Sequence, residues 1–263
     1  MSNTIVFIHG AWLTSLSWEN LTGYFEKKGY TCSAPEWPYR DQSAAQLREH
    51  TPPELAQIGV RELTDHYAAI VEALPEPPIL IGHSFGGLIV QQLLDRGLGR
   101  AAITLDSAAP KGVLAVDWDV LRSNSASLLK WMGWERVVTM SFPEFQFAFV
   151  NGFPEDQQRR CYDRYAVPET GRIFFQAAFA ALDPQNALSV DFKNNQRAPM
   201  LMIAGEHDHV VPAHVAKSNF EHYKQSTART DFHEFTGRAH LLIAQEGWED
   251  VADYMANWLE QLA

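Results

Sequence analysis

The sequence predicts an α/β protein: a doubly wound, mostly parallel β-sheet of about six strands, flanked by helices and carrying an inserted helical cap. Apolar, β-branched runs alternate with helix-like segments along most of the 263 residues, which is typical of parallel sheets. The alternation stops between Ala109 and Pro199, where helix-like sequence with many aromatic residues takes its place. We therefore expect a core domain formed by residues 1–111 and 197–263, and a helical cap formed by residues 112–196.

Six segments have the apolar character expected of the strands. In chain order they are Thr4–Ile8, Tyr30–Ala34, Ile79–Ile81, Ala101–Leu105, Met200–Ala204 and Thr230–Phe235. Parallel strands have their carboxyl ends at one edge of the sheet, where open α/β sheets form their sites. The loops after the first, third, fifth and sixth segments should therefore meet at that edge.

Four segments between the strands have the character of helices. They are Ser17–Lys28, the stretch from Thr51 to about Leu74, Gly86–Arg96 and Glu246–Leu262, which is amphipathic. Gly29 and Gly97 follow two of them and are typical helix stops. Thr51-Pro52-Pro53-Glu54 combines a capping box with proline in the first turn, which predicts a helix start.

A serine motif follows the third predicted strand. Gly82-His83-Ser84-Phe85-Gly86 has the form G-x-S-x-G and lies between a strand and a helix-like run. A turn of this kind forces Ser84 into a strained backbone conformation with its hydroxyl exposed. Gly82 and Gly86 are expected where a Cβ atom would collide with a neighbouring strand or helix. The context predicts a nucleophilic serine.

An activated serine needs a base, and the base needs an acid to orient it. After this motif the expected chain order is serine, acid and histidine. Asp208, in the polar loop after Met200–Ala204, is the candidate acid, and His240, after the last strand, is the candidate base. Asp106 directly follows another predicted strand and is a rival acid, and Glu206 is a weaker rival.

Four motifs taken together resemble the α/β-hydrolase superfamily. They are His9-Gly10-Ala11-Trp12, Gly82-His83-Ser84-Phe85-Gly86, Gly205-Glu206-His207-Asp208 with Val211-Pro212, and His240. They span nearly the whole chain, which is most similar to small bacterial serine hydrolases and to the plant-type methylesterase and hydroxynitrile-lyase group. The chain lacks the two edge strands that usually precede the first motif. A serine rather than an aspartate at position 84 argues against the epoxide-hydrolase and haloalkane-dehalogenase branches.

The resemblance implies a triad that cleaves carboxylic esters through an acyl-serine, with no cofactor. Ser84 attacks, His240 takes its proton and Asp208 orients the imidazole. The backbone N–H groups of Ala11 and Phe85 are the expected oxyanion hole. The same machinery is compatible with a lactonase, amidase, C–C hydrolase, perhydrolase or acyltransferase. A hydrolase-fold ligand receptor or regulator with slow turnover is a further alternative, because fold alone does not separate these classes.

Many large aromatic residues are spread through the predicted cap, and ten tryptophans and phenylalanines stand out. They are Trp118, Trp131, Trp134, Phe142, Phe145, Phe147, Phe149, Phe174, Phe175 and Phe179. Packing within the cap explains any one of them, but together they exceed what a small helical layer needs. Some should line an apolar pocket for a small or medium-sized substrate. We expect Trp12, Trp131 and Trp134 among the lining residues, and Phe85 at its border.

Composition limits the partners to small molecules. The net charge of −11 comes from scattered residues, and it disfavours nucleic acid and anionic membrane surfaces. No stretch reaches the roughly 18 apolar residues of a membrane span. The first strand begins almost at the N-terminus, which leaves no room for a signal peptide. The two cysteines, Cys32 and Cys161, lie far apart and are expected to be free thiols in the cytoplasm.

The remaining histidines predict no metal site. His207-Asp208-His209 places alternate side chains on one side of a loop, as in some metal sites, but the acid role explains Asp208 and no further ligand cluster appears. His9 is expected to brace the oxyanion turn, and His83 occupies a variable position of the serine motif. Surface or packing roles are expected for His50, His66, His214, His222 and His233.

Overall fold

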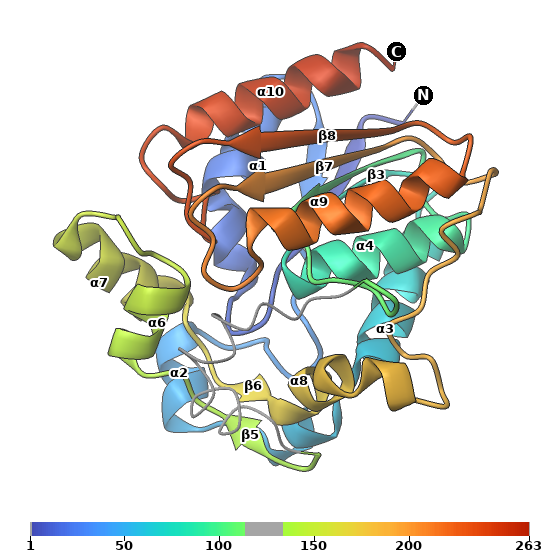
Figure 1. Cartoon of the computed structure of the whole chain (residues 1–263). Helices are drawn as coiled ribbons and strands as arrows, with labels where there is room; N and C mark the ends of the chain where they lie inside the picture. The colour runs from blue at the N-terminus through green and yellow to red at the C-terminus, as the bar shows by residue number, and fades with distance from the viewer. Residues whose placement is uncertain (1, 114–133, 263) are drawn as a thin grey trace.

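The computed structural model describes residues 2–113 and 134–262, and a six-stranded parallel sheet forms its centre (Figure 1). The strand order is β2-β1-β3-β4-β7-β8, and every neighbouring pair is parallel. The strands are β1 (Thr4–Ile8), β2 (Thr31–Ser33), β3 (Ile79–His83), β4 (Ala101–Leu105), β7 (Met200–Gly205) and β8 (Thr230–Phe235). The predicted doubly wound α/β fold is confirmed, and each strand begins and ends within two residues of its predicted segment.

Helices cover both faces of the sheet (Figure 1). The helices α3 (Val60–Glu72), α4 (Phe85–Asp95) and α9 (Ala213–His222) lie on one side, with α4 packed on β3 and β4. On the other side α1 (Glu19–Lys27) packs against α10 (Trp248–Glu260). Because both faces are covered, β3, β4 and β7 are buried along their whole length, as expected of parallel strands.

The first predicted helix is divided into two elements. A 3₁₀ helix, η1 (Ser15–Trp18), precedes α1. Gly29 ends the segment with a φ of +88°, a conformation that favours glycine. The N–H of Tyr30 donates to the carbonyl of Phe25 at 3.1 Å. Tyr30 therefore belongs to the helix end, and for this reason β2 begins one residue later than predicted.

The continuous helix predicted from Thr51 to about Leu74 is wrong. A short 3₁₀ helix, η2 (Pro53–Gln57), is followed by extended backbone, and α3 begins only at Val60. Thr51 does not cap a helix; its hydroxyl donates to the carbonyl of Leu47 at 2.7 Å. Gly59 is the actual N-cap residue, and its N–H donates to Glu62 at 3.1 Å. The local pattern therefore placed the helix start about two turns too early.

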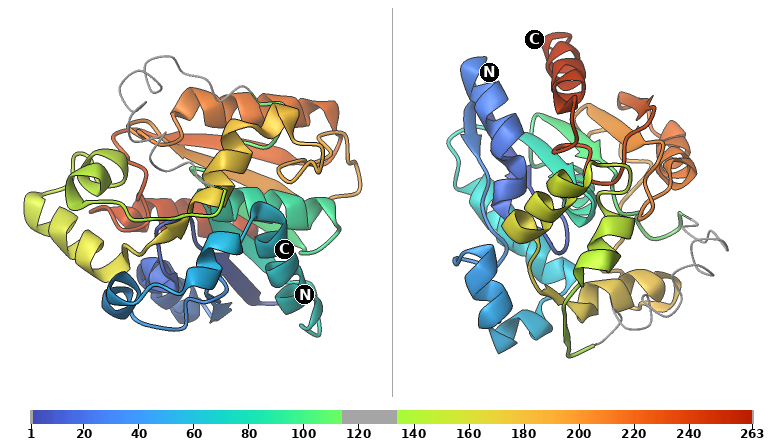
Figure 2. Two further views of the ribbon diagram at one scale, coloured as in Figure 1. Left: turned by 90° about the horizontal axis from the view of Figure 1, so that it is seen from below. Right: turned by 90° about the vertical axis from the view of Figure 1, so that its left-hand side faces the viewer.

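A helical insertion lies between β4 and β7, beyond the carboxyl ends of the strands (Figures 1 and 2). Its described elements are β5 (Val137–Val138), α6 (Phe142–Ala148), α7 (Glu155–Tyr165), β6 (Glu169–Thr170), α8 (Gly171–Ala178) and η3 (Ala180–Leu182). The predicted inserted cap is thereby confirmed, while its boundaries at residues 112 and 196 stay a prediction. The antiparallel ribbon of β5 and β6 was not predicted. Neither were α2 (Ala44–Glu49), α9 and η4 (Tyr223–Gln225).

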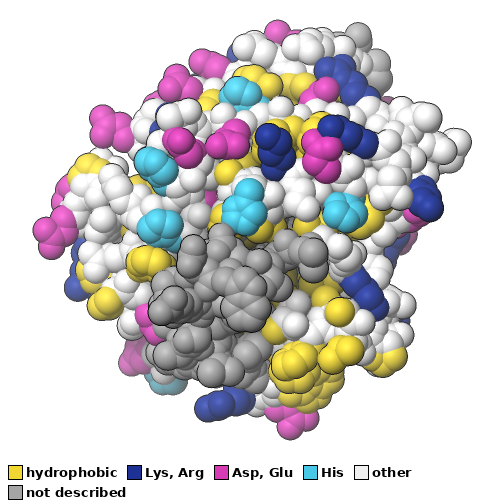
Figure 3. Space-filling model, in the orientation of Figure 1, with side chains coloured by type: hydrophobic (Ala, Val, Ile, Leu, Met, Phe, Trp, Pro, Cys, Tyr) yellow, Lys and Arg dark blue, Asp and Glu magenta, His cyan; other side chains and the backbone are white. Residues whose placement is uncertain are grey.

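Charged residues are scattered over the surface, as they are along the sequence. Acidic and basic side chains are interspersed on the face in Figure 3. Among the described residues, no helix is both long enough and apolar enough to cross a membrane. Cys32 and Cys161 are both free thiols.

Candidate active site

Ser84 lies on the sharp turn between β3 and α4. Its φ of 55° and ψ of −121° are unusual for a residue with a side chain, and such strain is characteristic of functional sites. A Cβ atom on Gly82 would lie 2.3 Å from the carbonyl oxygen of Gly86. One on Gly86 would lie 2.0 Å from the carbonyl oxygen of Ile8 in β1. Only glycine fits at these two positions, as the motif predicts.

Asp208 and His240 form a buried hydrogen-bonded pair. His240 Nδ1 donates to Asp208 Oδ2 at 2.7 Å, and both side chains are inaccessible to solvent. The other carboxylate oxygen accepts the N–H groups of Val210 at 2.6 Å and Val211 at 2.9 Å. His240 Nε2 is buried and has no hydrogen-bond partner among residues 2–113 and 134–262. With the proton on Nδ1, Nε2 of His240 has a lone pair that can accept a proton.

His83 supports the backbone of His240. Its Nε2 donates to the carbonyl oxygen of His240 at 2.7 Å, and the two ring centroids lie 4.7 Å apart. Burial, followed by the charge of His240, lowers the pKa of His83 well below its usual value. The His83 ring is therefore neutral and acts as a fixed donor, a role that the sequence did not indicate.

The two rival acids, Asp106 and Glu206, do not occupy the position of Asp208 beside His240 Nδ1. Asp106 follows β4 directly, and its Oδ1 accepts the N–H of Gly205 at 2.7 Å. The carboxylate that binds His240 Nδ1, however, is that of Asp208. Glu206 is exposed and accepts the N–H of Gly237 at 2.9 Å. Asp106 therefore lies in the site without contacting the imidazole Nδ1, and Glu206 lies outside it.

Potential metal ligands come together at one place in the described chain. One donor atom each of His83, Asp106 and His240 lies within 4.8 Å of the others. The predicted base belongs to this group, so a metal ion there would compete with its basic role. The side chains of the His207-Asp208-His209 loop diverge, since His209 Nδ1 donates to the carbonyl of Phe147 at 2.8 Å and His207 is exposed beside Glu206.

The burial of Asp106 leads to a prediction about stability. Burial, and then the neighbouring Asp208, raise the pKa of Asp106 well above its usual 3.8. Above about pH 4 the folded chain thus retains a proton that the unfolded chain has lost, so Asp106 makes stability fall as the pH rises. Asp106→Asn keeps an oxygen for the Gly205 N–H and cannot ionise. The Tm of the variant relative to that of the wild type should therefore increase as the pH is raised above about 4, where the unfolded wild-type chain loses this proton. A Tm difference that is constant with pH, measured by circular dichroism, would contradict this expectation.

The predicted oxyanion turn lies directly against the serine. A Cβ atom on Gly10 would be 2.7 Å from the Cβ of Ser84. Neither the N–H of Ala11 nor that of Phe85 donates to any residue that the structure describes. His9 braces the turn as expected: its Nδ1 donates to the carbonyl of Gly10 at 2.9 Å, and its Nε2 lies 3.2 Å from a carboxylate oxygen of Glu36.

Aromatic side chains surround this arrangement. Trp12 stacks on Phe174 with centroids 4.2 Å apart, and Phe174 meets the edge of Phe85 at 5.4 Å. Phe149 meets His240 at 4.9 Å. Trp12 and Phe85 therefore lie in aromatic surroundings, while their place in a substrate pocket stays a prediction.

Trp131 and Trp134 were also predicted to line the pocket, and the structure places Trp134 elsewhere. Trp134 is 48% exposed and contacts Phe175 and the guanidinium of Arg172 at the surface of the cap. None of these contacts involves a residue around Ser84. Trp118 and Trp131 lie outside the described residues.

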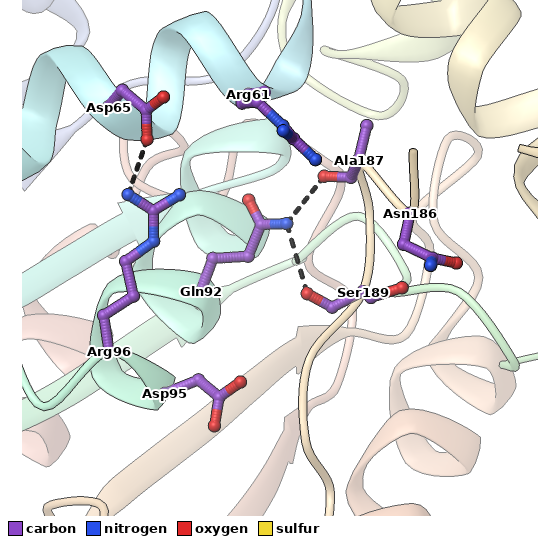
Figure 4. Close-up of a pocket in the computed structure, with 8 residues that line it drawn as sticks. All are labelled: Arg61, Asp65, Gln92, Asp95, Arg96, Asn186, Ala187 and Ser189. Carbon is purple, nitrogen blue, oxygen red and sulfur yellow. Dashed lines mark hydrogen bonds and ion pairs between the residues drawn. The ribbon is translucent and has the colours of Figure 1, made fainter. Parts of the chain in front are cut away.

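A separate polar cavity of about 260 Å³ lies between α3, α4 and the chain after η3 (Figure 4). Its charged groups are already paired: Arg96 with Asp65 at 2.6 Å, and Arg61 with the carbonyl of Gln185 at 2.7 Å. It contains none of the predicted site residues. The lining residues are Arg61, Asp65, Gln92, Asp95, Arg96, Asn186, Ala187 and Ser189.

The fold and the serine turn define a class of protein. The sequence matches the alpha/beta hydrolase family over residues 5–254, so the chain belongs to that family. This confirms the resemblance seen in the four motifs. A comparison with curated proteins gives no significant match.

Solved structures of similar fold include lipases and esterases. A monoacylglycerol lipase from Paleococcus ferrophilus has 19% sequence identity and a TM-score of 0.69, over 99% of this chain and 95% of that chain. An extracellular alpha/beta-hydrolase from a Paenibacillus species has 21% identity and a TM-score of 0.69, over 97% and 98%. The Arabidopsis methylesterase MES16 has 15% identity and a TM-score of 0.67, over 98% of each chain. Plant methylesterases are thus among the proteins that share this fold.

Sequence reasoning missed two charged residues next to the oxyanion turn. Arg40 and Glu169 form a fully buried ion pair, with 2.5 Å between nitrogen and oxygen. They lie far apart in the sequence, and neither belongs to a recognised motif. Only the folded chain brings them together.

Proposed function

We propose that this protein is a serine hydrolase that cleaves carboxylic esters of small to medium apolar substrates through an acyl-serine intermediate. The observation that carries the proposal is the buried pair of His240 and Asp208, whose Nε2 has no partner among the described residues. Ser84 lies on the strained turn directly after His83, and His83 binds the carbonyl of His240. Membership of the alpha/beta hydrolase family supports hydrolysis, and the similar structures described as a lipase and a methylesterase support esters.

In the proposed first step, Ser84 Oγ forms a bond to the ester carbonyl carbon while its proton passes to His240 Nε2. The negative charge then lies on the carbonyl oxygen, which accepts the N–H groups of Ala11 and Phe85. Collapse of this intermediate breaks the bond to the alkoxy group, which leaves with the proton from His240. Asp208 holds Nδ1 and stabilises the imidazolium throughout.

In the second step a water molecule attacks the acyl-serine. It gives one proton to His240 Nε2, and the carboxylic acid leaves as Ser84 regains its proton. Each group in the cycle returns to its starting state, so the proposed reaction needs no cofactor or metal.

The aromatic residues support apolar substrates. Trp12, Phe85, Phe149 and Phe174 contact one another or His240, so an acyl group bound there would leave water for an apolar surface. Each buried methylene is worth up to about 0.8 kcal/mol, roughly fourfold in the specificity constant.

We therefore expect kcat/KM for p-nitrophenyl esters to rise with acyl length, and to fall once the pocket is full. Measuring the series from acetate to palmitate tests this expectation. A steady rise to the longest chains, with a jump above the solubility limit, would indicate a lipase instead. A parallel panel of lactones and amides separates the related enzymes. Near-zero turnover, together with ligand-dependent binding of another protein, would indicate the receptor alternative.

We also propose that the protein acts in the cytoplasm. Its two cysteines are free, which suits a reducing compartment. The sequence features give no reason to expect a nucleic-acid or membrane partner.

A further inference from the structure

Trp12, the last residue of the oxyanion turn, is held almost entirely by the cap. Its φ of 58° is in the left-handed region, which is strained for a residue with a side chain. Its carbonyl accepts the N–H of Val167 at 3.0 Å, and its indole N–H donates to the carbonyl of Val138 at 3.3 Å. Its backbone N–H donates to the carboxylate of Glu169 at 3.0 Å. The cap thus fixes the conformation of the turn.

Glu169 is itself fixed by Arg40. The two side chains are completely buried, and Arg40 also donates to the carbonyl of Leu13 at 2.9 Å. Its guanidinium lies over the ring of Trp37, 4.7 Å from the centroid. The second carboxylate oxygen of Glu169 accepts the N–H of Thr170 at 2.7 Å. The hydrogen bonds of this pair therefore lead to the oxyanion turn, to Leu13 directly after it, or to the cap segment beside it.

A buried ion pair is weak support for stability alone, because removing two charges from water offsets most of their attraction. Its position suggests another role. Trp12 N–H belongs to the peptide directly after Ala11, so a carboxylate that fixes this peptide also restricts where the N–H of Ala11 points. An unneutralised carboxylate would oppose the negative charge that forms on the substrate oxygen, and Arg40 supplies the balancing charge.

We propose that Glu169 is a positioning residue for the oxyanion hole: it fixes the peptide between Ala11 and Trp12, while Arg40 neutralises its charge. The inference rests on the proposed ester-cleaving function for its catalytic consequence. The positioning itself rests only on the contacts of Trp12.

The alternative is that the pair merely attaches the cap to the core, and the chain offers a matched control for it. Glu19 of α1 accepts from Arg164 Nε and from the Tyr165 hydroxyl of α7, each at 2.6 Å. This second glutamate–arginine pair also joins core and cap, but it does not contact the oxyanion turn. Comparing Glu169→Met with Glu19→Met separates positioning from attachment, because methionine removes the acceptor oxygens at similar volume.

The experiment measures kcat and KM for p-nitrophenyl butyrate, and the second-order rate of Ser84 labelling by a fluorophosphonate. Loss of an oxyanion donor typically costs 10²–10³-fold, and a misdirected donor should cost less, about 10–100-fold. Glu169→Met, which leaves no acceptor for the Trp12 N–H, should lower kcat and the labelling rate by this factor and leave KM within about twofold. Glu19→Met should leave kcat within about twofold, even where it lowers Tm. Unchanged kcat in a folded Glu169→Met protein, or equal losses in both variants, would overturn the proposal.

Should Glu169→Met fail to fold, Arg40→Met with Glu169→Met removes both charges at similar volume, a replacement that proteins often tolerate. This double variant also lacks an acceptor for the Trp12 N–H and should show the same loss of kcat; wild-type kcat would refute the inference. Hydrogen exchange over residues 10–13 tests the positioning without turnover. Exchange there should be faster in the Glu169 variants and unchanged in Glu19→Met. If the wild type neither cleaves esters nor becomes labelled, the proposed function fails, while hydrogen exchange still decides whether Glu169 holds the turn.

Discussion

Replacement of Ser84 by alanine should abolish ester cleavage, with a loss of about a millionfold in turnover. Its position on the strained turn between β3 and α4 is the basis for this expectation. Alanine retains the Cβ and removes only the attacking oxygen, so the fold should be unchanged. Turnover of p-nitrophenyl esters and covalent labelling by a fluorophosphonate measure the effect, and circular dichroism checks the fold.

Ser107 provides a matched control for this experiment. It is also buried, next to the end of β4, and its hydroxyl accepts from Gln91 at 2.8 Å. Ser107→Ala should therefore lower stability slightly and leave the labelling intact. If labelling persists in Ser84→Ala, or is lost in Ser107→Ala instead, Ser84 is not the nucleophile.

Asp208→Asn should lower turnover by about 10⁴, with a stable fold. The hydrogen bonds around the carboxylate supply the reason. The N–H groups of Val210 and Val211 both point at Oδ1, so an asparagine must place its carbonyl oxygen there. Its NH₂ group then faces His240 Nδ1, which must accept a hydrogen bond rather than donate one. The imidazole proton moves to Nε2, and the base can no longer take the proton of Ser84.

Asp106→Asn is the comparison for this result. Asp106 does not bind His240 Nδ1, and its contact with the Gly205 N–H survives in asparagine. We expect a much smaller loss of turnover. Steady-state kinetics of the two purified variants measures both losses of turnover. A larger loss in Asp106→Asn than in Asp208→Asn would show that the functional acid is Asp106, at the end of β4.

The sheet and the catalytic candidates were predictable because their signals are local. A parallel strand covered on both faces is apolar throughout, as in Ile79–Ile81, and the glycines beside Ser84 are required by contacts within a few residues of the turn or with the adjacent strand. The error at Thr51 has the same origin. A capping pattern there is locally acceptable, but the helix start was decided by Gly59 and its contact with Glu62.

Features that depend on distant parts of the chain could not be predicted. Arg40 and Glu169 meet only because the ribbon of β5 and β6 lies beside the oxyanion turn, and neither residue is distinctive in its own segment. His83 is adjacent to Ser84 in sequence, yet its function depends on the carbonyl of His240, which is 157 residues away. The aromatic residues around the serine turn and His240 were expected as a group, but nothing in their local sequence distinguishes Phe149 and Phe174 from Trp134.

The hydrogen bonds between the cap and the loops that carry the proposed catalytic residues affect which mutations this protein can tolerate. Most of these contacts use backbone atoms of the cap: the N–H of Val167 binds Trp12, the carbonyl of Phe149 accepts from Leu241, and the carbonyl of Phe147 accepts from His209. Substitutions at such positions leave these hydrogen bonds in place, because the side chains do not form them; the ring of Phe149 additionally packs against His240. A shift of the chain by one residue, in contrast, would disturb these hydrogen bonds. Substitutions in these cap segments should therefore preserve the arrangement of the loops, whereas an insertion or deletion there would displace the loops that carry the proposed catalytic residues.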